Sequence, residues 1–292
     1  MIALEVPTAD ERSLEEARRL SEDSRKLRKK GKYDEAVTLT ERALAIREKV
    51  FGPDHLAVAD SLHALASLYD DKSDYVKAEP LNLRALAIRE KALGPDHPDV
   101  AKSLYNLAWI YSTRQDYTKA ELFYRRALAI QENALGPSHP EVATTLNDLA
   151  LLYLEKGDYD QSILVNQRVL SIREKALGPD DSGVARALTN LGQVYEVSGD
   201  YAKAESLYHR SLSIWEKALG PTHPDIAGAI DSLARAYYYN GDYANAEPLY
   251  KRALVLSRPL YLAMCRLPGR TSFRFGRCER ISNATSTRSQ PQ

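Results

Sequence analysis

Two short stretches of the chain carry residues that could hold a peptide. Lys102 and Asn106 stand four residues apart and would share one face of a helix. Arg186 and Asn190 repeat this spacing. An asparagine amide can donate to and accept from a peptide backbone, and the cation beside it can pair with a carboxylate. The spacing therefore predicts binding of an acidic or carboxy-terminal peptide segment; the alternative is a solvated polar helix face without a preferred ligand.

Residue types that could support catalysis or metal binding do not form such a pattern. Four histidines recur in equivalent positions: His55, His97, His139 and His223. Equivalent atoms of neighbouring helices should lie about 10 Å or more apart, whereas metal ligands lie about 2 Å from one ion. We therefore expect these histidines to stabilise connectors. The sequence has no glycine-rich phosphate loop, zinc-ligand spacing or Ser/His/Asp arrangement. We expect no enzyme activity, metal, cofactor or small-molecule substrate.

The elements that position these residues are set by a repeat of 42 residues. Tyr33, Tyr75 and four later tyrosines keep the step, and so do the Gly-Pro pairs Gly52-Pro53, Gly94-Pro95, Gly136-Pro137, Gly178-Pro179 and Gly220-Pro221. A fixed period of this size is typical of stacked supersecondary units. Such an array forms a long surface instead of an enclosed pocket.

Each repeat unit reads as two antiparallel helices. In the unit that begins near residue 56, Val58, Leu62 and Leu65 have helical spacing. A turn at 71–74 follows, and a second amphipathic run ends at Gly94, which can adopt a helix C-terminal conformation. The expected organisation is a short segment 1–12, helix pairs at about 13–50, 56–93, 98–135, 140–177, 182–219 and 224–257, and a basic tail 258–292 that we expect to be disordered. The predicted fold is an all-α solenoid.

The repeat pattern resembles that of the tetratricopeptide repeat family, and in particular the 42-residue units of kinesin light chains. The segments 85–101 and 199–205 carry the resemblance, which covers 13–257. It implies a right-handed superhelix whose concave groove is lined by the first helix of each pair. It also implies binding of partner polypeptides without catalysis. The candidate groove residues are Lys102, Tyr105, Asn106, Trp109, Asn147, Arg186, Asn190, Gln193, Asp231 and Arg235.

Three residues near this groove invite separate interpretations. Trp109 could anchor a ligand or pack on the neighbouring helix pair, because exposed tryptophans often dominate interface energies. We expect Asp148, in the intervening unit, to repel a ligand carboxylate. Trp215 falls in a second helix, so we expect it to pack near the convex side.

The distribution of charged residues and cysteines restricts which cellular compartment and which kinds of partner we expect. The chain has equal numbers of acidic and basic residues, but residues 258–292 hold seven arginines against one glutamate. The repeat body is therefore mildly acidic, which argues against nonspecific nucleic-acid binding by the repeats. The two cysteines, Cys265 and Cys278, lie outside the repeats. No apolar run approaches the roughly 20 residues that span a bilayer. We expect a cytoplasmic protein without a membrane span.

The end of the chain leaves several interpretations open. The repeat register stops near Ser257, and no polar helix closes the array. The tail could be disordered, could bind nucleic acid through its arginines, or could follow an interruption of the repeat run. We expect 260–267 to fold back weakly over the last unit, or the protein to self-associate there. The favoured function is a protein-interaction scaffold; the alternatives are a regulatory arm of a larger signalling or protease-like protein, and a nucleic-acid binder.

Overall fold

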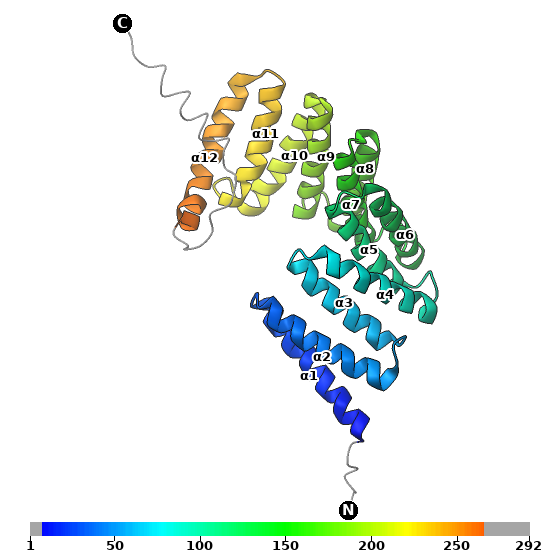
Figure 1. The fold of residues 1–292 in the computed structure, drawn as a ribbon. Coiled ribbons are helices and arrows are strands. Elements are labelled where there is room, and N and C mark those ends of the chain that lie inside the picture. The colour runs from blue at the N-terminus through cyan, green and yellow to red at the C-terminus, as the bar shows by residue number, and fades with distance from the viewer. Residues whose placement is uncertain (1–7, 266–292) are drawn as a thin grey trace, which may run out of the picture.

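The computed structural model describes residues 8–265, with side chains through residue 257. This part of the chain is all-helical and has no strand. Each helix packs on the next, so that consecutive hairpins stack along a curved path (Figure 1). The helices are α1 (Ala9–Lys29), α2 (Tyr33–Phe51), α3 (Leu56–Asp71), α4 (Tyr75–Leu93), α5 (Pro98–Thr113), α6 (Tyr117–Leu135), α7 (Pro140–Lys156), α8 (Tyr159–Leu177), α9 (Ser182–Ser198), α10 (Tyr201–Leu219), the short 3₁₀ helix η1 (Pro224–Ile226), α11 (Ala227–Tyr239) and α12 (Tyr243–Cys265). The predicted α-solenoid is confirmed.

The connectors between hairpins are fixed by side chains that cap helices. His97 Nδ1 accepts a hydrogen bond of 3.1 Å from the Asp99 backbone, and Pro98 occupies the first turn of α5. In the connector before α9, Asp181 replaces the histidine and caps the helix through a 2.6 Å bond from the Gly183 backbone. The recurring histidines are therefore helix caps, and Asp181 shows that an acceptor oxygen can do the same work.

Small residues let the two helices of a hairpin approach closely. Ala66, Ala108 and Ala150 are buried at equivalent positions of α3, α5 and α7. In α9 the same position is Gly192, and a Cβ added there would lie 2.7 Å from the Tyr208 ring on α10. The large ring and the missing Cβ thus compensate each other, as close packing requires.

The even-numbered helices are joined by a ladder of ion pairs. At each junction an arginine pairs with the glutamate 36 residues earlier, on the preceding even-numbered helix. The five pairs are Arg84–Glu48, Arg126–Glu90, Arg168–Glu132, Arg210–Glu174 and Arg252–Glu216. Partly exposed pairs contribute about 0–1 kcal/mol each, but their repetition keeps every junction in the same register.

The two ends of the array differ from the sequence expectation. The first helix begins at Ala9 instead of near residue 13, because Thr8 and Glu11 form a reciprocal capping box. At the other end α12 continues to Cys265, so its last turns lie within the expected tail. Leu254 of α12 is 51% exposed, whereas its counterparts Leu86 and Leu212 are 7% and 6% exposed. Among the side chains of residues 8–257, none covers this apolar side of the last hairpin. Leu267 and the rest of the expected tail lie outside the described residues.

Candidate functional site

The predicted groove residues meet on one surface formed by α3, α5, α7, α9 and α11, which we call the A-helix surface. Hydrogen bonds join its helices. Tyr105 Oη donates to Asp148 Oδ2 at 2.5 Å, from α5 to α7. Asn190 Nδ2 donates to Asn147 Oδ1 at 2.7 Å, from α9 to α7. Three hairpins thus contribute to one row of polar side chains, and the inter-helix bonds fix the row.

On the α5 part of this surface, polar side chains form hydrogen bonds with side chains of the neighbouring helices. Asn106 Nδ2 lies 3.0 Å from His63 Nδ1 on α3. Burial and the nearby Arg89 guanidinium lower the pKa of His63, which favours the neutral ring that accepts this bond. Burial and the bond to Asp148 raise the pKa of Tyr105 far above its usual range. Asp148 is therefore a hydrogen-bond acceptor within the row; its expected repulsion of a ligand carboxylate stays a prediction.

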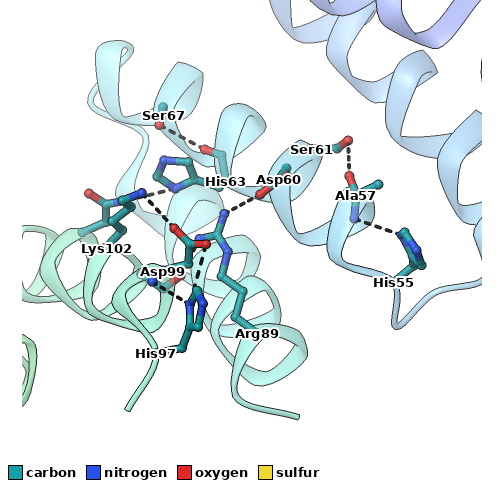
Figure 2. Close-up of polar contacts among 12 residues, drawn as sticks. His55, Ala57, Asp60, Ser61, His63, Ser67, Arg89, His97, Asp99 and Lys102 are labelled. Carbon is teal, nitrogen blue, oxygen red and sulfur yellow. Dashed lines mark hydrogen bonds and ion pairs between the residues drawn. The ribbon is translucent and has the colours of Figure 1, made fainter. Parts of the chain in front are cut away.

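Cations around α5 also have partners. Lys102 Nζ lies 2.8 Å from Asp99 Oδ1, one turn earlier on the same helix. Figure 2 shows this pair beside Arg89, which extends from α4 to Asp60 at 2.8 Å. Trp109, one turn after Asn106, is 46% exposed. The α5 stretch thus presents an exposed indole and a lysine that is already paired.

The α9 part of the surface contains an unpaired arginine. Arg186 is exposed and makes no ion pair with any side chain in residues 8–257. Gly183 stands three residues before it, where α5 has Asp99. Beside Arg186 is a hollow lined by Asn147, Arg186, Thr189, Asn190, Trp215, Asp225 and Ala229. Trp215 of α10 therefore borders this hollow, and it also packs against the buried core residues of α9 and α10, as expected of a packing residue.

A second arginine reinforces the positive charge near this hollow. Burial and the Arg186 guanidinium lower the pKa of Arg173 at the end of α8. Its counterparts on α2 and α4 donate to hydroxyl groups, as in the 2.6 Å bond from Arg89 to Ser103. At the Arg173 junction the hydroxyl is replaced by Ala187, and Arg173 donates to the Gly183 carbonyl at 3.1 Å. The sequence analysis did not predict Arg173. The signal that could have identified it is the loss of the hydroxyl residue that faces the equivalent arginine in earlier units.

The remaining predicted residues lie at the α9–α11 junction. Arg235 of α11 donates to Glu196 of α9 at 2.7 and 3.1 Å, and Asp231 lies 3.9 Å from the same guanidinium. Glu196 also accepts the Tyr208 hydroxyl at 2.8 Å. Burial raises the pKa of Asp231. This cluster is internally paired and makes a poor ligand site, whereas Gln193 of α9 is exposed.

These features define a helical-repeat protein with a polar surface for recognition. Sequence profiles of the tetratricopeptide repeat family match residues 25–91, 71–133, 115–175, 166–208 and 183–258. The chain belongs to the tetratricopeptide repeat family, and its units are of the kinesin-light-chain-like kind. No curated protein sequence matches the chain as a relative.

Solved structures agree with this assignment. A variant of a Podosopora anserina protein, described as a kinesin light chain with nearly identical repeats, is 26% identical, with a TM-score of 0.64; the match covers 69% of this chain and 95% of that one. BtubC (BKLC) from P. vanneervenii is 25% identical, with a TM-score of 0.63 and coverage of 91% and 98%. The repeat-bearing signal transduction ATPase PH0952 from Pyrococcus horikoshii shares the fold at 16% identity, with a TM-score of 0.69 and coverage of 87% and 38%.

Within the described residues, no helix combines the length and apolarity that crossing a bilayer requires.

Proposed function

We propose that the protein is a non-enzymatic cytoplasmic scaffold that binds partner polypeptides along the A-helix surface, with an acidic or carboxy-terminal segment at α9. The observation that carries this proposal is Arg186, a cation without a carboxylate partner in residues 8–257. Arg173 adds a second positive charge nearby. Charge-assisted bonds to a carboxylate are stronger than neutral ones. An incoming acidic group therefore gives Arg186 the partner that it lacks in this part of the chain, even though the Asp225 carboxylate also lines the hollow.

The asparagines beside Arg186 fit the backbone of such a segment. Their mutual bond uses one donor of Asn190 and one acceptor site of Asn147. Each amide therefore keeps further hydrogen-bonding capacity. Trp215 adds an apolar wall to the hollow. A peptide lying across α7 and α9 would meet a cation, two amides and an aromatic ring within one stretch of surface.

The open side of α12 supports a second function, self-association. Leu254 is exposed there, in contrast to its buried counterparts. Concentration-dependent sedimentation would reveal it. A regulatory role within a larger protein, and nucleic-acid binding through the arginines of 258–292, stay hypotheses from the sequence.

Binding of a labelled acidic peptide tests the proposal. The probe is an octamer of glutamate with a free carboxyl terminus, followed by fluorescence anisotropy with the full chain. The Arg186→Ala/Asn190→Ala variant should bind at least tenfold more weakly. Lys217→Ala, which removes an exposed lysine of α10 outside the hollow, is the charge-matched control and should change little. Equal affinities for all three proteins would refute the assignment to α9.

A further inference from the structure

A tyrosine near the end of each odd-numbered helix from α3 to α9 contacts a basic side chain. Lys77 lies over the Tyr69 ring at 5.2 Å from its centroid, Lys119 over Tyr111 at 4.9 Å, and Lys203 over Tyr195 at 5.0 Å. The fourth, Tyr153, receives hydrogen bonds on its hydroxyl from Arg125, the shorter at 2.8 Å. Cations are attracted to the negative face of an aromatic ring. Three of the four cations lie in the first turn of the helix that follows the tyrosine, whereas Arg125 lies on α6 of the preceding hairpin.

Three of these tyrosines also contact an acid, and Tyr69 does so through a 3.3 Å bond from its hydroxyl to Glu41. Glu79 accepts the Tyr111 hydroxyl at 2.7 Å and pairs with Arg114. Glu121 accepts the Tyr153 hydroxyl at 3.1 Å, and Lys156 lies 3.0 Å from the same carboxylate. Each complete cluster therefore contains a tyrosine, a glutamate that accepts its hydroxyl, and lysine or arginine side chains that balance the negative charge.

The last hairpin keeps the tyrosine and the glutamate but lacks the cations. Tyr237 and Glu205 stand where Tyr111 and Glu79 stand three units earlier, and Asn240 and Asn245 replace the two basic residues Arg114 and Lys119.

No lysine or arginine side chain takes over this role within residues 8–257. Asn245 Nδ2 donates to Asp242 Oδ2 at 2.7 Å, so it does not reach the ring as a cation would. In this part of the chain Glu205 has no ion pair, and the Tyr237 hydroxyl lies 3.2 Å from His209 Nε2. Burial, and after it the Glu205 carboxylate, raises the pKa of Tyr237.

Further tyrosines follow Tyr237 in the sequence, at the turn between α11 and α12. Tyr238, Tyr239 and Tyr243 are 50%, 45% and 62% exposed. Tyr239 stacks on Tyr201 with centroids 5.8 Å apart, and Tyr238 meets Tyr239 and Tyr243 edge-on at 5.5 and 5.3 Å. The ring contacts hold these aromatic faces in place, and Asp242 adds a second acid beside them.

We propose that Glu205, Tyr237, Tyr238, Tyr239 and Tyr243 form a second binding site, the turn-edge site, for an arginine or lysine side chain of a partner protein. The partner's cation would take the place of the two internal cations that other junctions contain. Tyrosine rings and a carboxylate are complementary to a basic group. The site shares no residue with the hollow at Arg186 and selects the opposite charge, so it is independent of the proposed acidic-peptide site.

A labelled peptide tests the turn-edge site on the full chain. The probe is acetyl-Gly-Arg-Gly-Arg-Gly-amide, and the comparison peptide has neutral citrulline in place of both arginines. Fluorescence anisotropy should give at least fivefold weaker binding for the citrulline peptide. Glu205→Gln should weaken binding of the arginine peptide several-fold. Equal binding of the two peptides, or no binding of the arginine peptide, would overturn the proposal.

A variant that restores the internal cations separates this site from general electrostatics. Asn240→Arg/Asn245→Lys recreates the residues of the α5–α6 turn and should abolish most of the binding without loss of helicity. Gln161→Lys/Ser198→Arg adds the same charge at equivalent positions of earlier turns and should keep affinity within twofold. If both variants weaken binding equally, the attraction is nonspecific and the assignment is wrong.

Discussion

The α3–α6 and α9–α12 regions have equivalent positions in the repeat but differ in which charges are paired. Among the described side chains, in the first region the cation is paired and an acid is not, and in the second the acid is paired and a cation is not. Around α5, Lys102 is paired with Asp99. Around α9, Arg186 has the same spacing to an asparagine, but Gly183 replaces the acid one turn earlier. A basic residue four positions before an asparagine therefore indicates a position on this surface. The residue three positions before the basic residue decides whether its charge is already paired or is free to bind a ligand.

For the acidic residues the difference is reversed: the acid of the α9–α12 region is paired, and its counterpart in the α3–α6 region is not paired with any side chain of residues 8–257. Glu196 of α9 is paired with Arg235 and Tyr208. Its counterpart Asp70 of α3 faces a column in which Trp109 replaces the arginine, and its buried Oδ1 has no hydrogen-bond partner within the described residues. Burial, and after it the neighbouring Asp71, raises the pKa of Asp70 to about 6.

The largest expected effect comes from exchanging residues at the hairpin contact of the two regions. Tyr208 is fully buried and bonded to Glu196, whereas its counterpart Asn82 is buried with no partner for its amide in the described structure. Tyr208→Asn should lower the free energy of unfolding by about 3–5 kcal/mol, because it leaves a cavity and removes the buried hydrogen bond to Glu196. Urea unfolding followed by circular dichroism measures this loss.

The reciprocal change provides the control. Asn82→Tyr should raise the free energy of unfolding by about 1 kcal/mol, since Tyr124 already fits against an alanine at the equivalent contact and the unpaired amide is removed. A loss of stability in Asn82→Tyr would show that the two hairpins are not interchangeable at this position.

A smaller effect, dependent on pH, is expected at Asp70. Its folded pKa of about 6 lies above the value for an unfolded chain, so the folded state holds the proton more tightly. Stability should therefore fall as pH rises from about 4 to 6. Asp70→Asn should be more stable than the original protein by about 1 kcal/mol at pH 7, a value reduced because Asp70 is only half-buried. The difference should vanish near pH 4; a difference independent of pH would contradict the assigned cause.

The paired and unpaired cations can be interchanged by one substitution. Gly183→Asp places an acid before Arg186, as Asp99 stands before Lys102. A partly exposed ion pair is worth about 0.2–1 kcal/mol, so the glutamate octamer should bind about two- to fivefold more weakly. Asp181→Asn in the same connector alters a charge without blocking Arg186 in this way and serves as a comparison. Unchanged affinity in Gly183→Asp would show that Arg186 is not limiting.

The smallest effect is expected from freeing the lysine of α5. Asp99→Ala removes the partner of Lys102 and should strengthen binding of the glutamate octamer about twofold. Anisotropy at low and high salt would separate this gain from a change in fold, because the gain should shrink as salt screens the charge. A gain that persists at high salt would point to another cause.

The fold was largely predictable because each unit repeats the same local signals. The 42-residue step, the Gly-Pro pairs and the apolar columns place the helices with errors of a few residues. The first helix was misplaced because Thr8 and Glu11 cap it before the apolar pattern begins.

The site was predictable only as a surface. The sequence columns place Asn106 and Asn190 at equivalent positions of their helices and Asn147 in the adjoining column, but their partners come from neighbouring hairpins and depend on how the hairpins stack. The same reason explains Trp215, whose helix is an even-numbered one but whose ring reaches the hollow beside Arg186. Predicting the contacts between units requires knowing the angle at which the units stack, and the sequence of one repeat does not give that angle.

The ladder of arginine–glutamate pairs along the even-numbered helices has a consequence for how such chains can change in length. Each rung joins a hairpin to its immediate predecessor by the same two positions. Loss or duplication of a whole hairpin during gene copying would leave every remaining junction with a matching rung. Descendants of this gene can therefore become longer or shorter in whole hairpins and still keep the ladder of the even-numbered helices without new substitutions in it.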